Sequence, residues 1–279
     1  MNVNELLARY GAGERDFRGM DLRGADLSGE DLSEANLREA NLAQANLSGA
    51  NLMGINLRES TLSGANLSHS KLILGNLIGA DLSDANLAQA NLTEVGLRGA
   101  LLPRANLAQA FLEDANLNEA NLDDCYCVGA NLARSSLNRA HLISANLEGA
   151  NLESASLASA TLTHARLTQA NLMGAVLSGA TLDMADLQGV DLSRAKLQGC
   201  NMVNTILTRA NLRGANLSWS SLRGANLQGA TLYRAKLSWS NLSGANLREA
   251  VMINASVAYT NLRNADLRGT ILPEGITHD

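Results

Sequence analysis

Aromatic residues, proline and cysteine are all scarce in this chain of 279 residues, which has 8 aromatic residues, 2 prolines and 3 cysteines. Eight aromatic side chains are too few to build a large core. The core must therefore consist of small apolar side chains that recur along the sequence. Three cysteines do not provide a disulfide framework, which favours a reducing compartment. The sequence has no apolar run of membrane-spanning length and no secretory signal pattern at its start. We therefore expect a cytoplasmic protein that does not engage a membrane.

Glycine is moderately frequent, but its 24 residues have no three-residue period, which excludes collagen. The apolar share of 46% excludes an intrinsically disordered chain. What the sequence has in excess is leucine in a strict register.

The register has a period of five residues and runs from Phe17 to Leu272 without a break. Of its 52 central positions 47 are Leu, and the exceptions are Phe17, Cys127, Met202, Met252 and Val257. Ala stands two residues before the central position in 35 of the 52 repeats, and Asn or Asp usually lies between them. Of the 24 glycines, 19 stand two residues after the central position.

A five-residue period fits neither a helix nor a continuous strand. Each step of five turns a helical position by about 140°, so no apolar stripe forms. On a strand, an odd step places successive leucines on opposite faces. The pattern is consistent if each pentad is a short extended piece followed by a corner, where glycine tolerates the required backbone angles.

Unusual residues return after 20 residues, which sets the number of pentads in one turn of the coiled chain. Ser218-Trp219-Ser220 is repeated at 238–240, and Arg194-Ala195-Lys196 is repeated two periods of 20 later, at 234–236. Four pentads per turn predict a four-sided cross-section and 52/4 = 13 coils. With a spacing of about 4.8 Å between paired coils, the rod should be roughly 60 Å long.

The series A-(D/N)-L-x-x resembles the pentapeptide repeat family, in particular its stand-alone members of cyanobacterial type. The resemblance covers residues 15–272 and implies an all-β fold, a right-handed quadrilateral parallel β-helix. We expect residues 1–14 to form a capping helix and residues 273–279 to form a short tail. The handedness comes from the family and not from the spacing.

The two ends of the repeat differ. Val3, Leu6, Leu7 and Tyr10 have helical spacing and predict an amphipathic lid over the first coil, with Asn4 or Asn2 as the N-cap and Gly11 as the stop. The C-terminal tail is too short for a comparable lid. Apolar residues at this end, which are Ile271, Leu272 and Ile276, lead us to expect either a monomer or a tail-to-tail homodimer.

The sequence shows no catalytic or metal-binding pattern. The four histidines share no ligand spacing with one another or with a cysteine. Cys125, Cys127 and Cys200 occupy inward positions of the repeat, where cysteine acts as a small apolar residue. A leucine-filled axis also leaves no cavity for a substrate. We expect a protein that is not an enzyme and that needs no cofactor or metal.

Departures from the repeat indicate where partners could bind. One candidate is an aromatic–basic strip, which comprises Trp219, Trp239, Tyr259, Lys196, Lys236, Arg194 and Arg234. The register places the three rings at one outward position in successive coils, with the lysines on the same face and the arginines at the adjoining corner. Such residues dominate binding hot spots. The alternative is a surface ladder that only stabilises neighbouring coils.

A second candidate is an apolar patch, which comprises Met53, Ile73, Leu74 and Ile78, all outward by the register. Nearby, Leu101 and Phe111 replace the usual outward Asn, close to Pro103 and Gly96. This stretch predicts either a local bulge or a small contact surface.

Charge and architecture together favour a non-enzymatic scaffold that binds an unidentified protein partner through its surface. Residues 1–140 carry 11 basic and 18 acidic groups, whereas residues 191–270 carry 10 and 3. The family resemblance implies an alternative, a DNA-mimicking modulator of DNA gyrase. That function requires an acidic rod with many central Phe residues, whereas the net charge here is −5 and one central residue is Phe. A third reading is a polyanion or nucleic-acid binder that uses the basic C-terminal coils.

Overall fold

The computed structural model describes residues 3–279 and divides the chain into two compact units, Met1–His141 and Leu142–Asp279. The first unit begins with the helix α1, Val3–Gly11. The remainder of both units consists of corners that alternate with single-residue parallel bridges, so no longer strand forms between residues 12 and 279. Within residues 3–279, no helix has both the length and the apolar character needed to cross a membrane.

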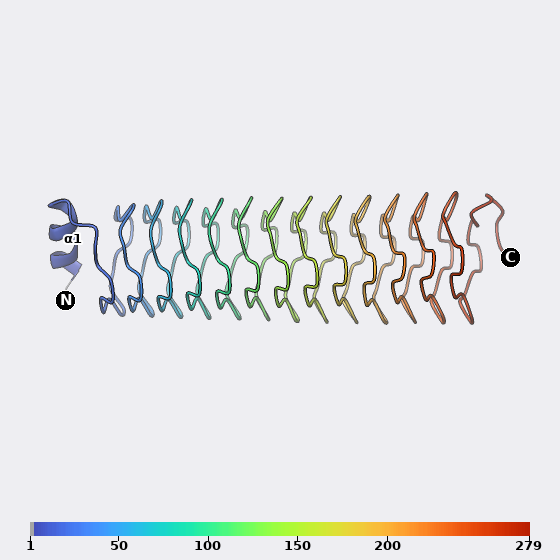
Figure 1. Cartoon of the computed structure of the whole chain (residues 1–279), viewed down its shortest axis with the longest axis horizontal. Helices are drawn as coiled ribbons and strands as arrows, with labels where there is room; N and C mark the ends of the chain where they lie inside the picture. Colours follow the sequence, from blue (N-terminus) through green and yellow to red (C-terminus); the bar gives the residue numbers. More distant parts are fainter. Residues whose placement is uncertain (1–2) are drawn as a thin grey trace. The chain divides into compact units, whose positions relative to one another are not determined.

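Each parallel bridge joins a residue to the one 20 positions later, as Asn46 pairs with Asn66 in the first unit and Asn226 with Asn246 in the second. We call each 20-residue turn a coil and each set of residues at 20-residue intervals a column. Two backbone hydrogen bonds hold each pairing. The Leu47 N–H donates to the Asn66 carbonyl at 2.7 Å, and the Asn66 N–H donates to the Ala45 carbonyl at 2.9 Å. The coils of each unit therefore stack in register (Figure 1).

Each pentad from residue 15 to residue 269 ends in a corner, and the second residue after its central position adopts a left-handed backbone conformation. Gly49 has φ 67°, and Gln44, at the equivalent position one pentad earlier, has φ 59°. A hydrogen bond from the Ala50 N–H to the Leu47 carbonyl closes the corner between them at 3.1 Å. The geometry explains why glycine concentrates at this position, because it lacks the Cβ that makes positive φ unfavourable.

The core of each unit is formed by the central Leu and the Ala two residues before it, both of which are almost fully buried. The Asn between them points outward and bonds in two directions. The Asn66 side chain donates from Nδ2 to Asn46 Oδ1 at 3.2 Å, and its Oδ1 accepts the Ser68 N–H at 3.2 Å. The outward Asn side chains therefore form an amide ladder along the column, and they also fix the corner.

Helix α1 covers the first coil, as its spacing predicts (Figure 1). Leu6 is completely buried, and the Tyr10 hydroxyl donates to the Ser33 carbonyl at 2.9 Å, which ties the helix to the coil. The prediction that Asn4 is the N-cap is wrong, because the helix already includes Val3. The other candidate, Asn2, lies outside the described residues.

The last coil is covered less completely. Its central side chains Val257, Leu262, Leu267 and Leu272 are only half-buried, in contrast to the same positions in earlier coils. The tail folds back so that Ile271 and Thr277 form an antiparallel bridge, and Ile276 remains exposed.

The bulge considered near Pro103 does not form. Leu101 pairs with Asp81 and Asn121, and Phe111 pairs with Asn91 and Asn131, in the normal register. In other pentads, the backbone N–H at the position of Pro103 donates to the Asn or Asp side chain two residues before, as Ser83 does to Asp81. Proline is tolerated there because this N–H takes no part in the backbone ladder. Leu101 offers no such acceptor, so no hydrogen bond of the backbone ladder is lost.

Gly75 is required by close packing rather than by its backbone angles. It occupies an inward position where Ala is usual, between the larger Ile55 and Val95 in the same column. A Cβ at Gly75 would lie 2.9 Å from the Leu72 carbonyl oxygen and 3.2 Å from Leu77 Cδ1. The missing side chain therefore compensates for the bulk of its neighbours.

We expect Gly75→Ala to lower the free energy of unfolding by about 1–3 kcal/mol, because the backbone oxygen cannot move aside without distorting the corner. Urea unfolding followed by circular dichroism measures the change. Gly96→Ala is the matched control, since a Cβ there meets no atom closer than 3.7 Å and its φ is not positive. Equal urea midpoints for the two variants would contradict this account of Gly75.

Candidate interaction surface

Three stacked aromatic side chains form the most distinctive surface feature of the second unit. The Trp219 and Trp239 ring centroids lie 5.0 Å apart with an interplanar angle of 1°, and Trp239 and Tyr259 lie 4.2 Å apart at 19°. All three side chains are exposed, Trp219 by 65%, Trp239 by 50% and Tyr259 by 75%. The structure thus brings together the three rings that the sequence predicted, and we call them the aromatic ladder.

The backbone holds the rings at corner positions. Trp219 and Trp239 both have φ 64°, and Tyr259 has φ 57°. A left-handed conformation costs a residue with a Cβ roughly 1–2 kcal/mol, a cost that glycine avoids. The ladder therefore occupies positions where glycine would be more favourable for the backbone.

Buried hydroxyl groups follow the two Trp residues, a feature that the sequence reasoning did not use. The Ser220 hydroxyl donates to the Leu197 carbonyl at 2.5 Å, and the Ser240 hydroxyl donates to the Leu237 carbonyl at 2.6 Å. The repeated Ser-Trp-Ser triplet was the available signal. These inward hydrogen bonds fix the segment that carries each ring.

The predicted basic residues lie beside the ladder. Lys196 and Lys236 each pair with Asn216 in one column, and Lys236 belongs to the same pentad as Trp239. Arg194 and Arg234 occupy the preceding corner. All four side chains are exposed.

Arg213 extends this group, although the sequence analysis did not single it out. The Arg213 and Arg234 guanidinium groups lie 5.1 and 5.0 Å from the centre of the Tyr233 ring, within the range of a cation–π contact. We call the five cations the basic cluster, which comprises Arg194, Lys196, Arg213, Arg234 and Lys236.

The two units differ in how their basic residues are neutralised. In the first unit, nine of the 11 Arg and Lys residues form ion pairs with Asp or Glu, and the exceptions are Arg15 and Lys71. In the second unit, Arg166 and Arg268 are paired, and the structure gives no ion pair for the nine basic residues from Arg194 to Arg263. The basic cluster is thus a region of uncompensated positive charge.

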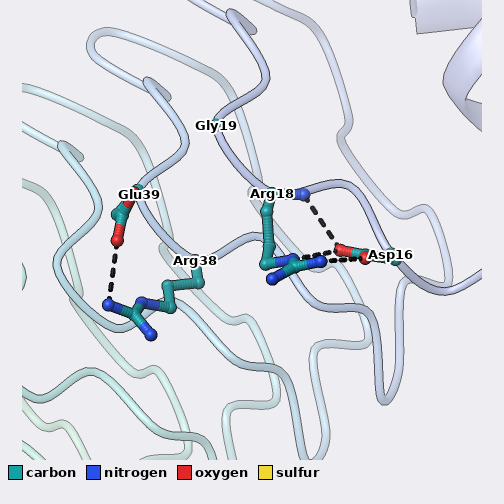
Figure 2. A pocket seen from close by; sticks show the side chains of 5 residues that line it. All are labelled: Asp16, Arg18, Gly19, Arg38 and Glu39. Atoms are coloured by element: carbon teal, nitrogen blue, oxygen red, sulfur yellow. Dashed lines mark hydrogen bonds and ion pairs between the residues drawn. The ribbon is translucent and has the colours of Figure 1, made fainter.

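One surface pocket lies in the first unit and is already neutralised by its own side chains (Figure 2). Its volume is about 410 Å³, and its lining includes Asp16, Arg18, Arg38 and Glu39. Arg18 contacts Asp16 at 2.7 Å, and Arg38 contacts Glu39 at 2.9 Å. Because each guanidinium already has a carboxylate partner, we do not assign this pocket as the site.

The apolar patch is also in the first unit. Met53 and Ile73 occupy one column in adjacent coils, and Leu74 lies at the next corner. Met53 and Leu74 are clearly exposed, Ile78 less so, and Ile73 is half-buried. The patch lacks the ring stacking and charge of the aromatic ladder.

The cysteines are core residues, as their register predicts. Cys125 and Cys127 are buried with their sulfur atoms 3.1 Å apart. Burial raises the pKa of the Cys200 thiol to about 12, and this thiol donates to the Leu177 carbonyl at 3.0 Å. Among residues 3–279, no group of three or more His, Cys, Asp or Glu side chains is arranged to hold a metal ion.

Comparison with known proteins identifies the class to which this repeated architecture belongs. The family described as "Pentapeptide repeats (8 copies)" matches residues 16–54, 35–72, 50–87, 80–118, 97–126, 120–158, 155–194, 191–229 and 230–269. The chain therefore belongs to the pentapeptide repeat family, whose fold is of the right-handed β-helix type. No curated protein matches the chain.

Several solved structures are similar to the chain. HetL, a pentapeptide repeat protein involved in heterocyst differentiation regulation from the cyanobacterium Nostoc sp. strain PCC 7120, is 34% identical, with 100% of both chains covered and a TM-score of 0.30. Rfr23 from the cyanobacterium Cyanothece 51142 is 36% identical over 36% of this chain and 59% of its own, with a TM-score of 0.17. QnrB1, a plasmid-mediated fluoroquinolone resistance protein, is 19% identical over 77% and 90%, with a TM-score of 0.33.

We expect Trp219 and Trp239 to stabilise each other by about 0.5–1.5 kcal/mol through ring stacking. A double-mutant cycle with Trp219→Ala and Trp239→Ala, followed by urea unfolding, measures this coupling. Alanine is the appropriate replacement because it keeps the cost of positive φ and removes only the ring. Additive effects, within about 0.3 kcal/mol, would show that the rings are adjacent without stabilising the coils.

A second prediction concerns Asp266, which accepts hydrogen bonds from Arg268 at 2.9 and 2.5 Å. These bonds lower the pKa of the Asp266 carboxyl from 3.8 to about 2. Because the folded-state pKa is depressed, the pair stabilises the fold above pH 3.8, and this contribution is lost as the pH falls toward 2.

We expect Arg268→Gln to raise the Asp266 pKa toward 3.8, as measured by NMR titration of the carboxyl carbon. Arg263→Gln is the control, because the structure gives Arg263 no ion pair, and it should leave the Asp266 pKa in place. An unchanged Asp266 pKa in the Arg268 variant would refute the assigned cause.

Proposed function

We propose that this protein is a non-enzymatic interaction scaffold that binds an unidentified protein partner through the aromatic–basic strip. In this proposal the β-helix has four sides and about 13 coils, and its flat faces present the binding residues. The observation that carries the proposal is the exposed aromatic ladder beside a basic cluster whose charge no acidic side chain neutralises.

The composition of the strip supports a binding role. Trp, Tyr and Arg are the residues most enriched in binding hot spots, and both Trp residues of the chain lie in the ladder. Stacking restricts the rings in advance, so a partner that binds them loses less side-chain freedom. The uncompensated cations would increase the rate of encounter with an acidic partner.

The half-buried central residues of the last coil support a proposal about assembly. Either the protein is monomeric, or two copies meet tail to tail and cover Val257, Leu262, Leu267 and Leu272. The scaffold would act in the cytoplasm, in keeping with three free buried cysteines.

An alternative function is modulation of DNA gyrase by DNA mimicry, which is implied by the family resemblance. The unpaired basic residues from Arg194 to Arg263 and the single central Phe disfavour it, because a DNA mimic requires a continuous acidic surface. Inhibition of gyrase supercoiling by the purified protein would favour this alternative over the scaffold.

We expect a partner in nuclease-treated lysate of the source cells to bind the wild-type protein and to lose at least tenfold in recovery with Trp219→Ala/Trp239→Ala/Lys236→Ala. These side chains point away from the core, so the variant should fold normally. The measurement is affinity capture followed by mass spectrometry.

The matched control is Phe111→Ala/Tyr126→Ala/Lys71→Ala, which removes two exposed aromatic side chains and one lysine from the first unit. It should retain the partner. Loss with the control and retention with the ladder variant would instead assign binding to the first unit.

A further inference from the structure

The aromatic ladder ends at an open ring face. The corner positions that precede Trp219 in its column are Gly199 and Gly179, both exposed and both with positive φ. A Cβ at Gly199 would meet no atom within 4 Å. One face of Trp219 therefore has no stacking partner in the column, and this agrees with its greater exposure relative to Trp239, 65% against 50%. We call the space over the two glycines the open rungs.

The open rungs have the dimensions of a short stack of planar groups. The next side chain in the column beyond the glycines is Ser159, three coil spacings from Trp219. At about 4.8 Å per coil, roughly 14 Å separates the two levels. Ser159 Oγ would lie 3.5 Å from a Cβ at Gly179, so the free length is closer to two coil spacings. Nucleic-acid bases stack about 3.4 Å apart, so two bases fit within it.

Positive charge borders the open rungs. Lys196 lies in the same pentad as Gly199, at most about 10 Å away along the chain, and Arg194 occupies the preceding corner. Neither side chain has an ion pair in the structure. On the opposite side lies Asp183, whose oxygens accept the Asn201 side-chain amide at 2.6 Å and the Val203 N–H at 2.7 Å. This carboxylate is already engaged with residues of the next coil.

We propose that the open rungs bind single-stranded nucleic acid, with bases stacked on Trp219 in continuation of the aromatic ladder and phosphates on Lys196 and Arg194. Each nucleotide carries both a planar ring and a negative charge, so one repeating unit satisfies both features of the site. An acidic polypeptide must supply a ring and a charge from different side chains. The proposal goes beyond the scaffold function and does not depend on it.

The binding mode follows from the geometry of the ladder. The rings of Trp239 and both neighbours already cover one another, so bases cannot insert between them without breaking two stacks. Tyr259, at the other end of the ladder, is even more exposed, at 75%. Stacking can extend at no such cost from Trp219, where two glycine corners and two cations without ion pairs adjoin the ring. Base stacking on aromatic side chains tolerates any sequence, so little sequence preference is expected.

The test uses purified full-length protein and a fluorescein-labelled octamer of deoxyadenosine, with anisotropy as the readout. We expect this octamer to bind at least tenfold more tightly than an abasic octamer of equal charge. It should also quench the protein's intrinsic tryptophan fluorescence, which arises from the two ladder residues alone. Equal affinity for the two octamers would overturn the stacking proposal.

The decisive variant is Gly199→Trp, which fills the first open rung with the protein's own ring. The backbone there already has φ 66°, close to that of Trp219, so the substitution is accommodated as it is one coil later. We expect at least a tenfold loss of octamer affinity. Gly244→Trp is the control, because it has the same φ and an equally open Cβ direction at a different corner, and it should bind as the wild type does.

Further experiments test the contribution of the cations and distinguish nucleic acid from two competing ligands, free nucleotides and acidic polypeptides. Arg194→Gln/Lys196→Gln should reduce the slope of log affinity against log salt by about 1.4, because each phosphate contact on a single strand contributes about 0.7. Trp219→Ala provides a second variant that removes the stacking face, and it should lose affinity to the same extent as Gly199→Trp. Binding of AMP as tight as that of the octamer would assign the site to free nucleotides. Binding of polyglutamate that Gly199→Trp abolishes would assign it to acidic polypeptides. Either result overturns the proposal.

Discussion

The chain turns a corner every five residues, and each corner requires one residue with φ near +60°. This constraint determines most of the other features. It limits each extended segment to a single bridging residue, directs Leu and Ala inward, and leaves the Asn between them outward to bond along the column. Because the same geometry repeats at every corner, each position in the pentad has one environment throughout a unit.

The corner is also where the surface can vary without disturbing the core. Glycine occupies many corners, but Glu, Gln, Arg and Trp are accommodated at the same φ. In the first unit the long side chains at and beside corners pair with one another, as Arg104 does with Asp84 at 2.6 Å. In the second unit the corners carry rings and unpaired cations. The two units thus have the same backbone geometry and differ in what their surfaces can bind.

Much of this was predictable from the sequence, because the five-residue register and the 20-residue recurrence report backbone geometry directly. They placed the core residues and aligned Trp219 with Trp239. The register could not show which cations are neutralised, since ion pairing depends on side-chain conformations in adjacent coils. The register does place Gly199 one coil before Trp219, but only the structure shows that a Cβ there would meet no atom and that the Trp219 ring is exposed. The bulge, which was one of two alternatives for the stretch near Pro103, does not form, because the position of Pro103 contributes no N–H to the backbone ladder.

The 20-residue column has a consequence for how such a chain can change in length. Insertion or deletion of five residues keeps every leucine inward. It nevertheless moves each later residue by one whole pentad around the coil, and so into a different column. A five-residue deletion between Trp219 and Trp239 would place Gly244 in the column above Trp219 and dissolve the ladder. Gain or loss of 20 residues preserves every column. Selection that preserves the core therefore tolerates length changes in steps of five residues, whereas selection that preserves the surface columns tolerates only steps of 20.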